Sequence, residues 1–365
     1  MNCILFILHL PPPIHGAAMM GKYIHDSSTV NKAFDCRYIN LTTSAELDDI
    51  GKWTWRKPIA FLRLVRSIRG TVKTWCPDLV YVTPNSKGIA FYKDFLVVEM
   101  LKARGCRVIL HYHNKGVQTR QNRWFDNILY KRFFKHVKVI LLAEPLYQDV
   151  CKYVRREDIY ICPNGIPLPT ESAVKKGQPR PEILFLSNLL ISKGILILLD
   201  ALAILKQQGH DFHCTIGGGE TKELSASILQ KEVHARGLQE NVTYKGKLMG
   251  KEKVSTIKNA DLFAHPTFQD CFPIVLLEAM SHGVPCITTN EGGIPCVVED
   301  GVTGFITEKK SPTAIAEKID NLIQHPDIRR KMGEAGRKRF LEHFTISTFE
   351  KRLTTILKAA IESQL

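Results

Sequence analysis

The sequence predicts an α/β protein made of two doubly wound domains with parallel sheets. Short apolar runs alternate with longer amphipathic segments along the chain, which is the pattern of successive strand–helix units. The apolar runs are continuous rather than alternating, as expected for strands that are buried on both faces. The 365 residues exceed one ordinary core and suffice for two.

Nine apolar runs are the predicted strands. In the first half they are Cys3–Leu8, Leu79–Val82, Arg107–His111 and Val139–Leu142. In the second half they are Ile183–Leu186, Phe212–Ile216, Val242–Tyr244, Leu262–His265 and Pro285–Thr288. Between the halves, residues 162–182 are rich in proline and polar side chains, as domain connections are. We therefore expect domains at 1–165 and 166–345, with a ligand cleft between them beyond the strand ends.

The positive charge of the chain is unevenly placed. The formal net charge is +14, and residues 1–170 hold 25 Lys and Arg against 13 Asp and Glu. Such a field favours phosphates, nucleic acid or an anionic membrane surface, although ordinary solubility is a sufficient reason for it. No helix-turn-helix, zinc or RNA-sheet motif is present, so we expect no nucleic-acid partner.

Cysteine usage and hydropathy indicate a cytoplasmic protein. None of the ten cysteines forms a C-x-x-C pair or a zinc-spaced cluster with histidine, which fits a reducing compartment. The apolar run at the N-terminus is too short for a signal peptide. No stretch is long and apolar enough to span a bilayer.

Glycine-bearing turns follow three of the predicted strands. They are "PPPIHGAAMMGKYI", "SNLLISKG" and "IGGGE". Backbone N–H groups at the Gly16–Ala17 turn could approach an anion where a helix begins. Lys193 could give a point charge to a phosphate, and the three glycines around Gly218 allow a ligand close to the backbone. Such turns are also common for purely geometric reasons.

The segment from His265 to Phe305 is more specific. "CFPIVLLEAMSHG" predicts a helix that begins near Pro273 and ends at Gly283. Asp270 then lies just ahead of the helix and Glu278 inside it. The N–H groups at the helix start, those of Phe272 and Ile274 included, form an anion site by geometry and dipole. The alternatives are a helix cap for Asp270 and a paired surface residue for Glu278.

The chain resembles retaining glycosyltransferases of family 4, which have the GT-B architecture of two Rossmann-like domains facing across a cleft. The similarity covers nearly the whole chain and is strongest at 183–305. The two acids of the family motif, separated by seven residues, fall on Asp270 and Glu278. The resemblance implies that Asp270 contacts hydroxyls of the donor sugar and that Glu278 holds the nucleotide ribose. Asp270 stands where Glu is usual.

Other segments match the family as well. "SNLLISKG" matches G-R-L-x-x-x-K-G, whose Arg and Lys clamp the donor diphosphate, so Lys193 is in place and Asn188 replaces the Arg. The turn with Gly218 lies beside the nucleotide, and the loop with Lys247 and Leu248 meets the base through its backbone. "HYHN" places His113 at a donor-facing histidine. "EGGIP", Glu291–Pro295, matches a glycine turn beside the donor. The HGAA turn matches the first-domain loop near the diphosphate, and residues 346–365 are expected to return to that domain as a helix.

The resemblance implies a retaining glycosyltransferase that uses a nucleotide-diphospho-sugar, with a uridine donor favoured over guanosine. We expect no cofactor, and no metal because no D-x-D triplet is present. The expected acceptor is a glycan or a lipid-linked glycan of the cell envelope. Three alternatives stay open: a degenerate nucleotide-sugar-binding protein, suggested by Asn188 and by Cys296 in place of a common Glu, a GT-B epimerase, and a phosphorylase.

Two basic segments with aromatic residues predict an acceptor and membrane surface in the first domain. Residues 50–77 hold seven basic residues and no acid, and "RWFDNILYKRFFKHVK" is similar. Basic amphipathic segments with aromatics suit an anionic membrane surface, so we expect peripheral binding at the inner face of the membrane. The alternative is a solvated helix face. The residues chosen for this surface are Trp53, Trp55, Arg56, Lys57, Arg63 and Arg66.

Overall fold

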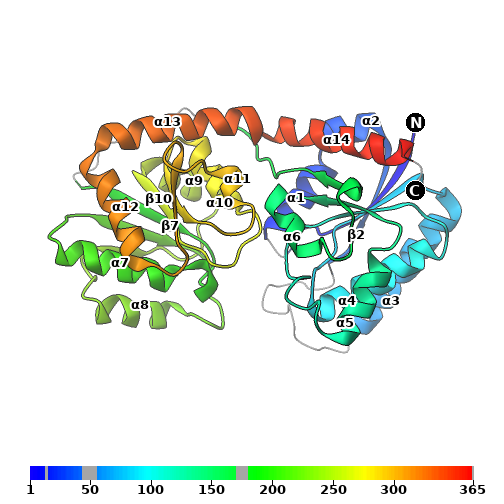
Figure 1. Ribbon diagram of the computed structural model, residues 1–365, viewed down its shortest axis with the longest axis horizontal. Helices are drawn as coiled ribbons and strands as arrows, with labels where there is room; N and C mark the ends of the chain where they lie inside the picture. Colours follow the sequence, from blue (N-terminus) through cyan, green and yellow to red (C-terminus); the bar gives the residue numbers. More distant parts are fainter. Residues whose placement is uncertain (13–14, 43–55, 170–179, 364–365) are drawn as a thin grey trace. The chain divides into compact units, whose positions relative to one another are not determined.

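The computed structural model describes residues 1–12, 15–42, 56–169 and 180–363, and the chain divides into two compact units (Figure 1). The first unit comprises Met1–Asn164 and Ile346–Leu365, and the second comprises Gly165–Thr345. The sequence prediction placed the boundary one residue later, after residue 165, and the return of the chain at residue 346. Among these described residues, each unit is an α/β domain with a parallel sheet of six strands.

The sheet of the first unit has the strand order β2-β1-β3-β4-β5-β6. Its strands are β1 (Cys3–Leu8), β2 (Asp35–Asn40), β3 (Leu79–Val82), β4 (Val108–His111), β5 (Lys138–Leu141) and β6 (Ile159–Ile161). The chain passes from β1 outward to β2 and then returns to β3 on the other side of β1. The carboxyl ends of β1 and β3 therefore flank the point where the strand order reverses, which is where ligands bind in such sheets.

The helices of the first unit connect these strands. Those of eight or more residues are α1 (Gly16–His25), α3 (Arg56–Trp75), α4 (Gly88–Lys102), α5 (Trp124–Phe133) and α14 (Ile346–Glu362). Short helices are α2 (Ser28–Ala33) and α6 (Tyr147–Val150). α3 buries Leu64, Ile68 and Val72, which are four residues apart and so share one face of the helix.

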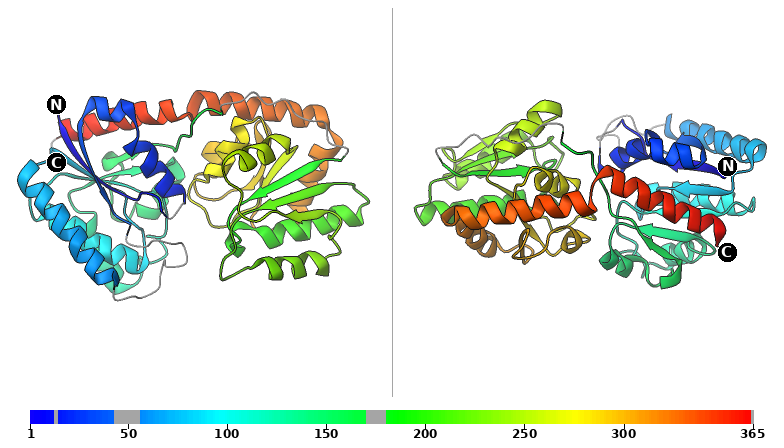
Figure 2. Two further views of the ribbon diagram at one scale, coloured as in Figure 1. Left: turned by 180° about the vertical axis from the view of Figure 1, so that it is seen from behind. Right: turned by 90° about the horizontal axis from the view of Figure 1, so that it is seen from above.

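The C-terminal helix α14 packs on α2 in the first unit, and the two helices lie side by side in Figures 1 and 2. Phe349, Leu353 and Leu357 of α14 are fully buried. Thr29 donates a hydrogen bond to Glu350 at 3.1 Å, and the Arg107 guanidinium donates to the carbonyl of Ile361 at 2.6 Å. The last segment of the chain thus completes the core of the first unit.

The sheet of the second unit has the order β12-β11-β10-β7-β8-β9, which is the strand order of a dinucleotide-binding Rossmann domain. Its strands are β7 (Glu182–Leu186), β8 (His213–Gly217), β9 (Val242–Tyr244), β10 (Leu262–His265), β11 (Cys286–Thr289) and β12 (Gly304–Thr307). The strand order reverses between the neighbouring strands β7 and β10. The loops that follow these two strands therefore meet at one edge of the sheet.

Helices cover both faces of this second sheet. One face packs against α7 (Ile195–Gln207), α8 (Ala226–Ala235) and α12 (Pro312–Gln324) in a continuous apolar core that includes Phe185, Ile216 and Ile287. The other face carries α9 (Gly250–Asn259), α10 (Ile274–Ser281) and α13 (Pro326–His343). Figure 1 shows α7 and α8 on one side of the strands and α9 and α10 on the other. The unit is therefore doubly wound, as predicted.

The structure adds three strands that the sequence did not predict, and each lies at a sheet edge. They are β2, β6 and β12. β2 alternates between exposed and partly buried positions, so it lacks the continuous apolar run on which the prediction depended. Within the described residues, no helix is long and apolar enough to cross a membrane.

Candidate functional site

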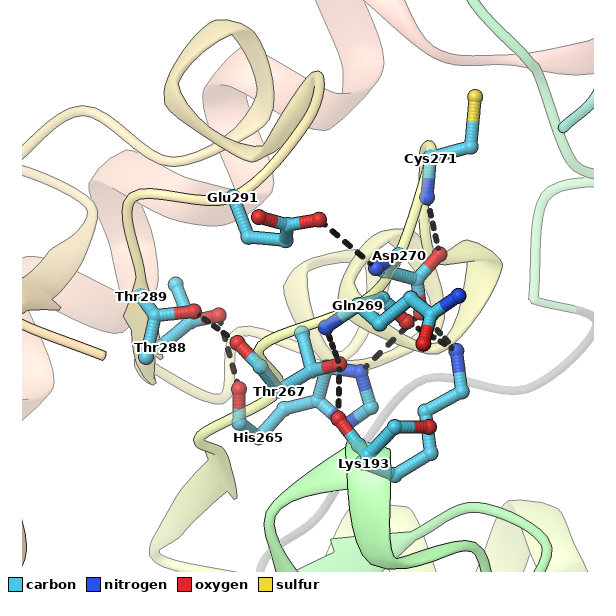
Figure 3. A network of polar contacts seen from close by, with 10 residues as sticks. Lys193, His265, Thr267, Gln269, Asp270, Cys271, Thr288, Thr289 and Glu291 are labelled. Atoms are coloured by element: carbon cyan, nitrogen blue, oxygen red, sulfur yellow. Dashed lines mark hydrogen bonds and ion pairs between the residues drawn. The ribbon is translucent and has the colours of Figure 1, made fainter. Parts of the chain in front are cut away.

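The best-defined polar cluster lies at the edge of the second sheet where the strand order reverses. Lys193 follows β7 and Asp270 follows β10, and the Lys193 ammonium lies 2.5 Å from Oδ2 of Asp270 (Figure 3). The same ammonium donates to the carbonyl of Gln269 at 3.2 Å. Two of the residues predicted for one ligand site are thus in direct contact.

A glycine brings these two loops together. Lys193 ends a short 3-10 turn, and Gly194 follows it with a φ of 83°, in the left-handed region that favours glycine. A Cβ atom on Gly194 would lie 2.0 Å from the carbonyl oxygen of Pro266, in the loop after β10. Only glycine permits this close approach of backbones, which sets Lys193 against Asp270.

Asp270 is held as an anion by two neighbours. Burial alone would raise the pKa of Asp270, but His265 and Lys193 together lower it well below its ordinary value. The Nε2 atom of His265, at the end of β10, lies 3.6 Å from Oδ2 of Asp270. Burial lowers the pKa of His265, and Asp270 opposes this effect. The ion pair of Lys193 and Asp270 carries little net charge.

The loop that carries Asp270 is clamped by the turn after β11. Oε1 of Glu291 accepts a hydrogen bond from the backbone N–H of Asp270 at 3.2 Å, and the N–H of Gly293 donates to the carbonyl of Cys271 at 2.7 Å. Glu291 is almost fully buried and pairs with the ammonium of Lys309. A Cβ on Gly292, whose φ is 56°, would lie 2.5 Å from the Asp270 carbonyl oxygen. Figure 3 shows Glu291 facing the Asp270 backbone.

The helix after Asp270 differs in detail from the alternatives weighed in the sequence. α10 begins at Ile274 with Pro273 as its N-cap, so Asp270 is not the cap. Its Oδ1 instead accepts a hydrogen bond from the N–H of Cys271 at 2.8 Å. Phe272 is buried and Ile274 is partly buried. Gly283 follows the end of the helix with a φ of 71°, as the predicted stop requires.

Glu278 of α10 has a protein partner that the sequence did not indicate. The ammonium of Lys253, on α9, lies 2.7 Å from Oε1 and 2.6 Å from Oε2 of Glu278. About a quarter of each side chain is exposed. Within the described residues, no hydrogen bond or ion pair joins Glu278 to the Lys193–Asp270 pair, so the two motif acids belong to separate ion pairs. Glu278 does not need a ligand hydroxyl to offset its burial.

The loops after β7, β8 and β9 form the rest of this edge. A Cβ on Gly218 would lie 1.7 Å from the carbonyl oxygen of Ser187, so the glycine turn packs directly against the Asn188 loop. Oδ1 of Asn188 accepts a hydrogen bond from the N–H of Gly219 at 3.3 Å. Leu248 is buried against Gly217, and Lys247 is exposed. Asn188 therefore orients the glycine turn and brings no charge.

The predicted residues of the first unit lie at the carboxyl edge of its own sheet. Gly16 and Ala17 are the first residues of α1, whose N-cap His15 accepts a hydrogen bond from the N–H of Ala18 at 3.3 Å through Nδ1. His113 lies two residues beyond β4, with its ring 4.2 Å from that of His111. These positions are the ones at which a Rossmann-like sheet presents ligand-binding groups.

Histidines at this edge are held neutral by burial. Burial lowers the pKa of His113 to about 4, against the smaller raising effect of the neighbouring Asn164 side chain. Burial likewise lowers the pKa of His9, which follows β1, to about 3. Nδ1 of His111 lies 2.5 Å from the Tyr81 hydroxyl, so one ring nitrogen of this buried histidine has a partner within the core. No group of three His, Cys, Asp or Glu side chains among the described residues could hold a metal ion.

A polar hollow on the second unit was not predicted. It has a volume of about 550 Å³ and lies between α9 and the sheet face formed by β7 and β8. Glu182 accepts from the hydroxyl of Thr215 at 2.5 Å and lies 2.7 Å from Nδ1 of His213. Lys245 also lines the hollow. Single polar residues on otherwise apolar strands are the only sequence signal for it.

The proposed membrane surface is partly described. Trp53 and Trp55 lie outside the described residues, and Arg56 and Lys57 begin α3. Arg63 and Arg66 are exposed on α3, beside Ile59 and Leu62, which are 54% and 66% exposed. In the second basic segment, Trp124, Phe125 and Ile128 of α5 are exposed, and Trp124 is 75% exposed. Both segments thus present apolar and basic side chains to solvent.

Comparison with known proteins finds one recurring family among the matches to the second unit. Residues 170–339 match the model of the family described as "Glycosyl transferases group 1". The chain is 32% identical over 161 residues to the capsular polysaccharide biosynthesis glycosyltransferase CapM of Staphylococcus aureus, covering 44% of this chain and 41% of CapM. It is 27% identical over 206 residues to a D-inositol 3-phosphate glycosyltransferase of Corynebacterium glutamicum, covering 55% of this chain and 46% of that protein. These matches span less than half the length of the curated relatives. The second unit therefore matches the group 1 glycosyltransferase family.

Solved structures extend the likeness of fold to the whole chain. A glycosyltransferase from Rickettsia africae superposes with a TM-score of 0.77 at 17% identity, covering 100% of this chain and 99% of that one. HepE of Anabaena, solved in complex with UDP, gives a TM-score of 0.74 at 17% identity, covering 98% and 100%. The chain has the GT-B fold of two Rossmann-like domains.

Proposed function

We propose that this protein is a retaining glycosyltransferase that moves a sugar from a nucleotide-diphospho-sugar to a glycan or lipid-linked acceptor. The ion pair of Lys193 and Asp270, at the reversal point of the second sheet, is the observation that carries the proposal. In this pair, an ammonium that can bind phosphate lies next to a buried carboxylate that can accept hydrogen bonds from sugar hydroxyls. The pair lies in a domain that matches the group 1 family.

The hydrogen-bonding capacity of this pair suits a sugar diphosphate. An ammonium has three N–H donors, and Lys193 uses one on Asp270 and one on Gln269, so one is left for a phosphate oxygen. Asp270 stays ionised because its pKa is held low, and an ionised carboxylate only accepts hydrogen bonds. It therefore orients donor hydroxyls and does not act as an acid at neutral pH.

The proposed reaction needs no covalent intermediate. The acceptor oxygen bonds to the anomeric carbon on the face from which the bond to the diphosphate breaks. The acceptor proton passes to the departing phosphate oxygen, and the nucleoside diphosphate leaves. A diphosphate is already a good leaving group, so catalysis consists of positioning and charge stabilisation. We assign positioning of the donor to Asp270, Glu278 and His113.

We favour a uridine donor over guanosine and a role in cell-envelope polysaccharide assembly. UDP complexes among the structures of similar fold and the capsular relative support this choice, although one relative is a GDP-mannose-dependent mannosyltransferase from Mycobacterium tuberculosis. The experiment is a panel of UDP-, GDP- and ADP-sugars with release of nucleoside diphosphate as the readout. Release from one donor without added phosphate supports transfer. Binding without release would instead support a degenerate nucleotide-sugar-binding protein, which the neutral Asn188 favours.

The reaction is proposed to need no metal, because basic side chains such as Lys193 can act together with backbone N–H groups to offset the diphosphate charge. We expect full nucleotide release in excess EDTA, and abolition of release by EDTA would contradict this part of the proposal. An epimerase would release no nucleotide, and a phosphorylase would require phosphate, so the same assay separates these enzymes.

We further propose that the protein works at the inner face of a membrane through the first unit. The exposed apolar and basic side chains of α3 and α5 support this proposal. Co-sedimentation with vesicles should increase with anionic lipid and fall when Trp124 and Ile128 are both changed to Ser. Equal binding to neutral and anionic vesicles would argue for a solvated surface instead.

A further inference from the structure

Charge balance at the Lys193–Asp270 pair leaves the proposed diphosphate short of positive charge. The carboxylate of Asp270, 2.5 Å away, already offsets the charge of Lys193. A diphosphate brings more than one negative charge and would meet a nearly neutral pair. Asn188, on the same loop, adds a neutral amide that is already engaged with Gly219. Another cation is needed at this edge if a diphosphate binds there.

The loops after β7, β8 and β9 are joined into one continuous edge. The N–H of Leu189 donates to the carbonyl of Gly219 at 2.8 Å, and the N–H of Gly218 donates to the carbonyl of Gly246 at 2.7 Å. The hydroxyl of Tyr244 also donates to the Gly218 carbonyl, at 2.8 Å. A side chain from the loop after β9 can therefore lie over the glycine turn and reach the Asn188 loop.

Lys247 is the cation whose side chain lies over the glycine turn. A Cβ built on Gly219 would lie 3.2 Å from Oδ1 of Asn188 and 4.0 Å from Cδ of Lys247. The stem of Lys247 thus runs over Gly219 next to Asn188, in the space that the missing side chain of the glycine leaves open. Lys247 is exposed, and in the part of the chain that the structure describes its ammonium has no hydrogen-bond or ion-pair partner.

We propose that the Lys247 side chain binds the diphosphate of the donor and supplies the positive charge that Asn188 does not. The inference rests on the proposed function and deepens it, because it assigns a residue of this chain to the leaving group. A lysine that reaches over a three-glycine turn meets a phosphate at close range, since no side chain on the turn intervenes.

The test compares Lys247→Met with Lys245→Met. Methionine keeps most of the apolar stem and removes the charge. Lys245 lies on the same loop but lines the polar hollow with Glu182 and His213, so it is a matched control for the overall basic field. Calorimetry measures binding of UDP, GDP and ADP, and then of the monophosphate of whichever base binds. Thermal unfolding checks that each variant is folded.

Lys247→Met should weaken binding of the nucleoside diphosphate roughly 10- to 100-fold, the effect of losing one charge-assisted hydrogen bond. Binding of the monophosphate should fall less, and Lys245→Met should bind like wild type. Adding Asn188→Arg to Lys247→Met should restore much of the lost affinity, because it returns a cation to the neighbouring position.

Two results would overturn the inference alone: wild type binds a nucleoside diphosphate and Lys247→Met binds it equally well, or Lys245→Met loses as much affinity as Lys247→Met. If folded wild-type protein binds none of the three nucleotides, the proposed function fails together with the inference. The two failures are therefore distinguishable within one series of titrations.

Discussion

The carboxyl edges of the two sheets differ in how they handle charge. The edge of the second unit carries ion pairs, Lys193 with Asp270 and Lys309 with Glu291. The edge of the first unit carries imidazoles that burial keeps neutral, such as His9 and His113. One fold type therefore carries buried neutral imidazoles after its strands in one unit and the Lys193–Asp270 and Lys309–Glu291 ion pairs in the other. The strand order thus places a site, whereas the side chains after each strand decide its chemistry.

Of the changes considered for the two edges, breaking the ion pair of Lys193 and Asp270 should cause the largest loss of stability. Lys193→Met leaves the carboxylate of Asp270 buried without its cation, and we expect about 3 kcal/mol of lost stability. Denaturant unfolding of wild type, each single variant and Lys193→Met/Asp270→Asn would measure the coupling. The double variant should be more stable than Lys193→Met. Additive losses would mean that the two side chains do not stabilise each other.

The neutral imidazoles at the edge of the first unit predict that the stability of the protein depends on pH. The pKa of His113 is about 4 in the folded protein against an ordinary 6.5, so the unfolded chain binds the proton more readily. The stability from a neutral His113 is present above pH 6.5 and is lost as the pH falls from 6.5 towards 4. Between pH 7 and pH 5, His113→Leu should therefore lose about 2 kcal/mol less stability than wild type does.

Unfolding at pH 7 and pH 5 measures this difference. His136→Asn is the control, because His136 is exposed and its positive φ of 57° is one that asparagine tolerates. An unchanged pH dependence in His113→Leu would mean that His113 titrates freely and that the first edge is not neutral.

The smallest expected effect concerns the second acid of the motif. Lys253 and Glu278 are each about a quarter exposed, so solvent screens their pairing, and Lys253→Met should cost about 1 kcal/mol or less. Unfolding in low and high salt measures it. A loss of several kcal/mol would show that Glu278 is as dependent on its cation as Asp270 is, and the two acids would then be alike.

The sequence predicted the central strands and missed three edge strands for one physical reason. β1, β3 and β10 are buried on both faces and appear as continuous apolar runs, so their bounds were predicted to the residue. β2, with residues such as Asp35 and Arg37, is half exposed and shows no such run. Edge strands pack against fewer neighbours, so fewer of their residues need to be apolar.

The same limit applies to the site. Lys193 and Asp270 could be chosen because each follows an apolar strand and matches a family motif. Lys253 and Lys309 could not, because their partners Glu278 and Glu291 lie 25 and 18 residues away in the chain. Their pairing depends on how the helices and loops pack. A long-range ion pair leaves no local pattern in a single sequence.

The most direct test of the charged edge is calorimetric binding of UDP, GDP and ADP to wild type and Lys193→Ala, with EDTA present. We expect that wild type binds one of the three nucleotides and that the variant binds it at least 10-fold more weakly, because a charge-assisted contact to the diphosphate is lost. Equal binding by a folded Lys193→Ala variant, or no binding of any nucleotide by wild type, would contradict it.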